Sequence, residues 1–266
     1  MFNIVASDLD GTLLNPNHRL TPFAKRILRL LETLNIHFVF ATGRHYVNVM
    51  EIRDDLNINA YMITSNGSRI YNSKNKLIGA YDLDIDVIHD LLYIAHRDLE
   101  ITTNIFRYNE WLVNRCLFDQ TSFLRGSNLN VRIYQRETLS LDGINKIYFT
   151  SNDYDKLFSL EKKINDRWHS QVNVSFSLPT CLEVMSGGVS KGHALELVAS
   201  LLGYHMKDCI SFGDGMNDQE MLSMTGKGCI MLNAHQRLKD ALPFLEIIGS
   251  NVNDAVPYYL ERMYFC

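Results

Sequence analysis

Residues 2–12 read FNIVASDLDGT, an apolar run followed at once by two carboxylates. The run from Ile4 to Ala6 is typical of a strand buried on both faces of a parallel sheet. In such folds the chemistry lies at the carboxyl ends of the strands, where Asp8 and Asp10 are expected. Carboxylates this close repel each other unless a positive group holds them. Magnesium is the usual cation with oxygen ligands beside phosphates, so the stretch predicts a magnesium-assisted reaction at an aspartate.

The overall composition indicates a folded soluble protein. The chain has 266 residues, of which 46% are hydrophobic and 21% charged, enough for one large domain or a core with a smaller domain. The formal net charge of -4 argues against a nucleic-acid binder, which usually has a strongly basic face. We see no signal peptide and no apolar run near the roughly 20 residues that span a bilayer. We therefore expect a partner that is neither nucleic acid nor membrane.

The cysteines and histidines point to a reducing compartment and away from zinc. The five cysteines are scattered and form no C-x-x-C pair, so reduced thiols in a cytoplasmic protein are expected. They are Cys116, Cys181, Cys209, Cys229 and Cys266. The nine histidines show no spacing typical of zinc ligands. We expect a monomer or a small homo-oligomer.

Apolar spacing predicts an α/β core in two pieces. Strands and helices alternate after the first strand, which is the signature of a doubly wound parallel sheet. The first piece has expected helices at 22–34 and 45–56 and strands at 37–41 and 60–63. The pattern resumes after Gly187, with expected strands at 209–212, 228–232 and 246–248 and helices near 218–225, 234–242 and 254–263. The core is therefore assigned to residues 1–82 and 186–266.

Residues 83–185 follow a different pattern and are expected to form an inserted α+β domain. Helical spacing covers 84–96 and 153–168, and extended runs occur at 101–106, 110–114, 145–150, 171–177 and 180–185. This mixture predicts an antiparallel sheet with helices. Polar and aromatic residues on its strands are candidates for contact with a substrate, although aromatics at alternating spacing are more often sheet packing. These candidates are Arg107, Tyr108, Trp111 and Arg115.

Two further positions suit a bound phosphate. Thr42-Gly43 follows a buried strand, and a hydroxyl with exposed backbone N–H groups can bind phosphate oxygens. The alternative is a simple turn with Thr42 as a local cap.

Lys191 stands at the start of an expected helix, where a cation is unfavourable unless an anion also binds. The alternative is a solvent-exposed lysine.

The turn at residues 213–218, GDGMND, is the most specific segment. A structural turn rarely needs two acids and an amide directly after a strand, and the acids would repel each other without a cation. Asp214 is the expected metal ligand, and Asn217 is an expected donor to a phosphate oxygen. Asp218 has three open roles: it could cap the helix, hold Lys191, or reach the metal through water.

Taken in order, four motifs resemble those of the haloacid dehalogenase-like phosphatase superfamily. They are Asp8-x-Asp10-Gly11-Thr12, Thr42-Gly43-Arg44, Lys191, and Gly213-Asp214-Gly215-x-Asn217-Asp218. The position of the insert, together with Ser65-Asn66-Gly67 and residues 188–192, resembles the Cof-type branch. The likeness covers the whole chain and is closest to enterobacterial Cof-like phosphatases acting on pyridoxal phosphate and sugar phosphates. It implies a Rossmann-like core with an inserted cap that sets substrate specificity.

The resemblance also implies a role for each motif residue. Asp8 would be the nucleophile that forms an aspartyl-phosphate, and Asp10 the general acid and then the base. Magnesium would bind Asp8, the backbone carbonyl of Asp10, and Asp214, with Asp218 in support. The groups expected to hold the phosphoryl oxygens are the backbone of Leu9, Thr42, the backbone of Gly43, Lys191 and Asn217.

Two other functions fit the same sequence. A phosphotransferase or phosphomutase would use the same aspartate and pass the phosphoryl group to an alcohol or sugar. A non-catalytic sensor of phosphorylated metabolites would keep the site without turnover, although intact Asp8 and Asp10 argue against it. Pyridoxal phosphate, hexose phosphates and flavin mononucleotide are all open as substrates.

Overall fold

The computed structural model describes residues 1–94, 96, 98–115, 129 and 131–266, so Cys116 lies outside the described residues. The chain divides into two compact units. Unit 1 consists of Met1–Gly79 and Ser190–Cys266, and unit 2 of Ala80–Val189. These limits fall a few residues from the expected domain boundaries. The role of unit 2 as a substrate-specificity cap stays a prediction.

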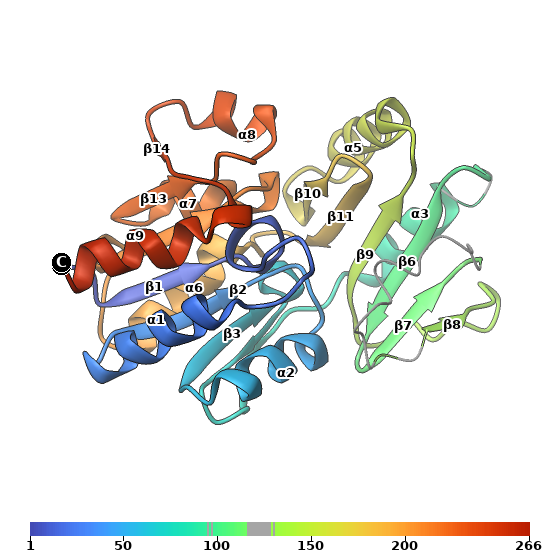
Figure 1. Cartoon of the computed structure of the whole chain (residues 1–266). Coiled ribbons are helices and arrows are strands. Elements are labelled where there is room, and N and C mark those ends of the chain that lie inside the picture. Colours follow the sequence, from blue (N-terminus) through green and yellow to red (C-terminus); the bar gives the residue numbers. More distant parts are fainter. Residues whose placement is uncertain (95, 97, 116–128, 130) are drawn as a thin grey trace. The chain divides into compact units, whose positions relative to one another are not determined.

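Unit 1 contains the sheet that positions the motifs. Its strand order is β14-β13-β12-β1-β2-β3-β4-β5. Figure 1 labels β14, β13, β1, β2 and β3 of this sheet. Strands from β14 to β3 are parallel, and β4 is antiparallel to β3. The order along the sheet reverses between β1 and β12, which makes their carboxyl ends the switch point where α/β folds bind ligands. The bounds are β1 (Ile4–Ser7), β2 (His37–Ala41), β3 (Ala60–Thr64), β4 (Arg69–Tyr71), β5 (Leu77–Ala80), β12 (Cys209–Gly213), β13 (Lys227–Ile230) and β14 (Glu246–Ile247).

Helices cover both faces of this sheet, as the continuous apolar runs predict. On one face Val5 and Phe40 pack with apolar residues of α1 (Pro22–Thr33), α2 (Tyr46–Leu56), α8 (Gln236–Ala241) and α9 (Ala255–Tyr264). On the other face Ile4 and Ala6 pack against α6 (Lys191–Leu201), beside which lies α7 (Gln219–Met224). Helices α1 and α9 run side by side (Figure 1). Helix α1 begins as expected, with Thr21 accepting from the Ala24 N–H and proline in the first turn.

Unit 2 combines a sheet of order β10-β11-β9-β6-β7-β8 with helices α3 (Ile85–Ile94) and α5 (Tyr154–Trp168). Four of the five strand pairs are antiparallel. The pair β7 and β8 is parallel, so the expectation of an antiparallel sheet is wrong there. A long connection separates these two strands, and parallel pairing requires one. The bounds are β6 (Thr102–Arg107), β7 (Glu110–Val113), β8 (Val131–Ile133), β9 (Ile144–Thr150), β10 (Val172–Leu178) and β11 (Cys181–Ser186).

None of the helices in the described part of the chain combines the length and apolar composition needed to cross a bilayer.

Candidate active site

The carboxyl ends of β1 and β12 bring two of the predicted carboxylates together. Asp8 directly follows β1, and Asp214 directly follows β12. The strands pair in register from Ile4 opposite Cys209 to Ser7 opposite Phe212, and the Asp8 N–H donates to the Phe212 carbonyl at 3.0 Å. Residues distant in the chain therefore meet at the switch point of the sheet.

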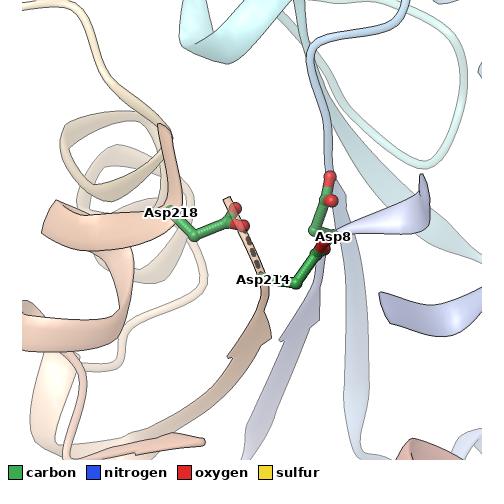
Figure 2. Close-up of side chains that lie close together, drawn as sticks. All are labelled: Asp8, Asp214 and Asp218. Atoms are coloured by element: carbon green, nitrogen blue, oxygen red, sulfur yellow. Dashed lines mark hydrogen bonds between the residues drawn. The ribbon is translucent and has the colours of Figure 1, made fainter. Parts of the chain in front are cut away.

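Three acidic side chains gather there: Asp8, Asp214 and Asp218 each have a carboxylate oxygen within 4.8 Å of the others' (Figure 2). Burial raises the pKa of Asp8 well above its ordinary value, Lys191 opposes this, and the charges of Asp218 and Asp214 add to it. Burial and the Asp218 charge raise the pKa of Asp214 to about 7, against a hydrogen bond from Thr12. Burial and mutual repulsion thus disfavour the ionised forms of Asp8 and Asp214, and a cation beside them would oppose both effects.

The turn after β1 encloses Asp214. Thr12 Oγ1 donates to Asp214 Oδ1 at 2.6 Å. Gly11 has a φ of +76°, and a Cβ atom there would lie 2.2 Å from Asp214 Oδ2. Only glycine suits a position that combines a left-handed backbone with so close an approach. A set of neighbouring carboxylate oxygens that repel one another fits a hard divalent cation such as magnesium.

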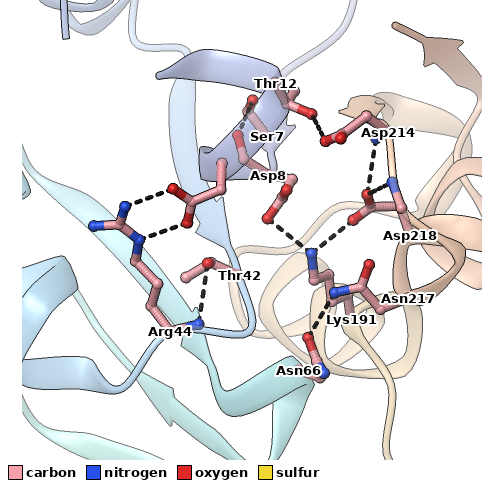
Figure 3. A network of polar contacts seen from close by, with 12 residues as sticks. Ser7, Asp8, Thr12, Thr42, Arg44, Asn66, Lys191, Asp214, Asn217 and Asp218 are labelled. Carbon is pink, nitrogen blue, oxygen red and sulfur yellow. Dashed lines mark hydrogen bonds and ion pairs between the residues drawn. The ribbon is translucent and has the colours of Figure 1, made fainter. Parts of the chain in front are cut away.

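Lys191, the first residue of α6, supplies the positive charge among these acids. Its side chain is fully buried, so the alternative of an exposed lysine is wrong. Nζ donates to Asp8 Oδ1 at 2.8 Å and to Asp218 Oδ1 at 2.7 Å (Figure 3). Burial alone would lower the pKa of Lys191, but the charges of Asp218 and Asp8 raise it above its ordinary value. Lys191 is therefore a buried ammonium shared by two carboxylates.

Asp218 closes the turn that carries Asp214. Its Oδ2 accepts the N–H groups of Asp214 and Gly215, both at 2.9 Å, while Oδ1 accepts from Lys191. Of the three roles left open for Asp218, holding Lys191 is thus observed directly. Capping of α7 by its side chain is not observed, because the N–H groups that it accepts precede that helix.

Asp10 is held by two side chains whose role the sequence did not reveal. Arg44 donates from Nε to Oδ2 at 2.6 Å and from Nη2 to Oδ1 at 2.5 Å, and His18 Nδ1 lies 2.7 Å from Oδ1. Burial alone would raise the pKa of Asp10, but hydrogen bonds from His18 and Arg44 hold it well below its ordinary value. The hydrogen bond with Asp10 in turn raises the pKa of His18. Asp10 is an ionised carboxylate in this geometry.

The predicted phosphate-binding groups come from the same edge of the sheet. Thr42 follows β2 and is buried, with its Oγ1 accepting the Arg44 N–H at 3.2 Å. Asn217 Nδ2 donates to Asn66 Oδ1 at 3.0 Å (Figure 3). Leu9 lies in the turn Leu9–Leu13, and Gly43 lies between Thr42 and Arg44. No signal in the sequence pointed to the pairing of Asn217 with Asn66, although the segment containing Asn66 carried part of the family resemblance.

The candidates for substrate contact in unit 2 all have structural partners there. Trp111 is buried and its Nε1 donates to Asn104 Oδ1 at 3.1 Å. The other three make contacts as follows: Arg107 with Glu110 and the Asp142 carbonyl, Tyr108 with Asp142, and Arg115 with the Asp98 and Leu99 carbonyls. Packing explains Trp111, whereas the other three make hydrogen bonds within unit 2 and Tyr108 is 51% exposed. Contact with a substrate stays a prediction for all four.

A family model for haloacid dehalogenase-like hydrolases matches residues 5–260. The chain belongs to this family. Two relatives are similar over nearly the whole length. A Buchnera aphidicola (subsp. Baizongia pistaciae) protein named "Putative phosphatase" is 47% identical, with 100% of this chain and 99% of the relative covered. A Serratia proteamaculans protein named HMP-PP phosphatase is 34% identical, with 98% and 95% covered.

Solved structures agree on the fold. A haloacid dehalogenase-like hydrolase from B. subtilis superposes with a TM-score of 0.88 at 22% identity, covering 98% of this chain and 99% of that one. The Rossmann-like core with an inserted α+β domain is thereby confirmed. Membership of the haloacid dehalogenase-like family, Cof-type branch, is also confirmed, as is the expectation of a phosphatase-class hydrolase.

Proposed function

We propose that the chain is a magnesium-dependent phosphatase that hydrolyses small phosphomonoesters through an aspartyl-phosphate on Asp8. One observation carries the proposal: the Asp8 carboxylate lies buried at the switch point, 2.8 Å from Lys191 Nζ and beside Asp214. A carboxylate is an established covalent nucleophile for phosphoryl transfer. Lys191 favours the ionised form of Asp8 that such an attack requires.

In this proposal the metal is held by the Asp8 and Asp214 carboxylates and the backbone carbonyl of Asp10. The donor set consists of oxygens, and the raised pKa values of Asp8 and Asp214 indicate charge that a cation would neutralise. When bound, magnesium supplies positive charge to the transferred phosphoryl oxygens. Asp218 supports the site by holding Lys191 and the turn that carries Asp214.

The remaining phosphoryl oxygens are assigned to the other motif residues. Lys191 provides a buried cation, and the Thr42 hydroxyl and the Asn217 amide provide neutral donors. The backbone N–H groups of Leu9 and Gly43 complete the set. Phosphoryl transfer depends mainly on positioning and on charge stabilisation, which a rigid set of buried donors supplies.

Asp10 is assigned to proton transfer with the leaving alcohol and then with the attacking water. In the present geometry its carboxylate is ionised, as a base must be, but its lowered pKa makes it a weak base while Arg44 and His18 hold it. As an acid it must first take up a proton, and the bidentate contact with Arg44 opposes this. The acid half of the cycle therefore requires that Asp10 leave Arg44 and His18.

The substrate is assigned to the class of small phosphorylated metabolites. Relatives named HMP-PP phosphatase are 34–35% identical over nearly the whole chain, which adds HMP-PP to pyridoxal phosphate, hexose phosphates and flavin mononucleotide as candidates. A cytoplasmic location is part of the same proposal, because the four described cysteines are free thiols.

A phosphate-release screen over these compounds, with magnesium and with a chelator, tests the proposal. Release that requires magnesium is expected for at least one of them. Asp8→Asn should abolish turnover, because an amide cannot act as the nucleophile, whereas Asp55→Asn, which alters an exposed ion pair with Lys25, should not. If Asp8→Asn keeps more than a few per cent of the rate, the nucleophile assignment is wrong.

Asp10→Asn separates the two roles given to Asp10. It should lose most of the turnover but still bind magnesium, because the metal is assigned to the backbone carbonyl. A lost magnesium response would contradict this division.

The alternative of a phosphotransferase is tested by adding acceptor alcohols to the wild-type reaction. A phosphorylated alcohol among the products would support it.

A further inference from the structure

The turn Ser65–Gly67, directly after β3, holds an unusual backbone. Its three residues have positive φ values of 48°, 56° and 103°. Glycine adopts such values readily and asparagine tolerates them, but a serine there is strained. Strain of this kind persists only where the surrounding structure imposes it, and it is concentrated at functional sites. The strain in this turn therefore suggests that one of its side chains must be held in a defined position.

Two backbone hydrogen bonds fix the turn to the end of β2. The Ser65 N–H donates to the Arg44 carbonyl at 2.9 Å, and the Asn66 N–H donates to the Thr42 carbonyl at 3.0 Å. On its other side the turn approaches the start of α6, since a Cβ atom on Gly67 would lie 2.4 Å from the Ser190 carbonyl oxygen. The turn is thus packed between the segment of Thr42 and the helix that begins with Lys191.

The side chain that this backbone presents is Asn66. It is 1% exposed, and its Oδ1 accepts from Nδ2 of Asn217, which is 7% exposed. A carboxamide can present either its oxygen or its nitrogen to a ligand. Because Asn66 offers an acceptor, it selects the orientation in which the Asn217 nitrogen faces it. Within the described part of the chain the second hydrogen on that nitrogen has no partner, so it can donate to a ligand.

We propose that Asn66 is a positioning residue, which fixes the amide of Asn217 so that Asn217 donates to the transferred phosphoryl group. The inference rests on the proposed function, which assigns Asn217 to the phosphate. The strained turn places the Asn66 carboxamide between the segment of Thr42 and the start of α6. There its Oδ1 lies 3.0 Å from Nδ2 of Asn217.

Asn66→Gly is the informative variant. Glycine accepts the left-handed backbone without strain, so the turn should keep its shape while the carboxamide is removed. We expect kcat/KM to fall about three- to tenfold, as for the loss of one well-oriented hydrogen bond. The loss should appear mainly in kcat, because phosphoryl contacts strengthen in the transition state.

A double-mutant cycle separates positioning from a general structural role. If Asn66 acts through Asn217, Asn66→Gly should have no further effect in an Asn217→Ala background. Asn57→Gly is the matched control: Asn57 is exposed at the end of α2, has a φ of 54°, and should give wild-type kinetics. Wild-type turnover of Asn66→Gly beside an impaired Asn217→Ala, or multiplicative losses in the double variant, would overturn the proposal.

Binding of inorganic phosphate, measured by calorimetry with magnesium present, keeps the two proposals apart. If the wild-type protein hydrolyses no phosphomonoester, the proposed function fails, and phosphate affinity then decides the role of Asn66. Weaker binding by both Asn66→Gly and Asn217→Ala supports positioning, while an unchanged affinity of Asn66→Gly overturns it. A wild-type protein that neither hydrolyses esters nor binds phosphate refutes both proposals.

Discussion

Replacing Lys191 with methionine tests the electrostatics of the site directly. Methionine is unbranched and apolar, so it fills much of the same volume without the charge. The change removes the donors that lie 2.8 Å from Asp8 Oδ1 and 2.7 Å from Asp218 Oδ1. Both carboxylates are buried and lose the cation that they share. We expect the free energy of unfolding to fall sharply.

The size and the pH dependence of this loss follow from burial. Removing one partner of a buried ion pair costs about 3–5 kcal/mol. Without Lys191 the pKa of Asp8, already raised by burial, rises further. A carboxyl whose pKa is higher in the folded than in the unfolded state destabilises the fold above its unfolded pKa, and protonation removes the penalty as the pH falls. The deficit should therefore be larger at about pH 7.5 than at about pH 5.5.

Urea unfolding followed by far-ultraviolet circular dichroism, in a chelator, measures this loss. Tryptophan fluorescence is less suitable because both tryptophans, Trp111 and Trp168, lie in unit 2. Lys227→Met is the control, since Lys227 pairs with Glu246 at 2.8 Å on the surface and should contribute at most about 1 kcal/mol. A Lys191→Met variant no less stable than Lys227→Met, or equally destabilised at both pH values, would refute the reasoning.

Three further outcomes are expected. Gly11→Ala should lower the urea midpoint more than Gly203→Ala, because both glycines have positive φ but only at Gly11 would a Cβ atom meet Asp214, at 2.2 Å; equal losses would argue against this crowding. Magnesium affinity should rise between about pH 6 and pH 8 with proton release on binding, because Asp214, with a pKa of about 7, must ionise; calorimetry in two buffers checks this, and a pH-independent affinity contradicts it. Asp10→Asn should return the raised pKa of His18 toward its ordinary value, as read from its ring resonances by NMR. The stabilisation that His18 gains from Asp10 is complete below the unfolded pKa of His18 and disappears as the pH rises through its folded pKa. If the substitution leaves the titration of His18 unchanged, the pairing with Asp10 is contradicted.

Much of the core could be predicted from local patterns. The strand at 37–41 and the helix that begins at Pro22 coincide with β2 and α1, because buried parallel strands read as continuous apolar runs and helices carry caps. The short strands β4, β5 and β8 were not predicted. Runs of three or four residues carry too little periodicity to identify a strand; in addition, β4 and β8 each include an arginine, and β5 includes a glycine.

The site divides in the same way. Strand ends rich in carboxylates and glycine marked Asp8 and Asp214. The position of Lys191 at a helix start indicated a nearby anion, but it left open whether the lysine is buried or exposed. The contacts of His18 with Asp10 and of Asn66 with Asn217 depend on how separate turns meet in space. No sequence spacing predicts either contact. Only the folded structure therefore reveals that His18 contacts Asp10 and that Asn66 contacts Asn217.

The arrangement of unit 1 has a consequence for how the protein is made. Its central strand β1 pairs on one side with β2, which follows closely, and on the other with β12, which begins only at Cys209. A ribosome adding about 5–20 residues per second delivers β12 roughly 10–40 s after β1. During that interval the backbone N–H and C=O groups on the β12 side of β1 are without their strand partner. Asp8, the proposed nucleophile, is thus synthesised well before β12 completes its surroundings.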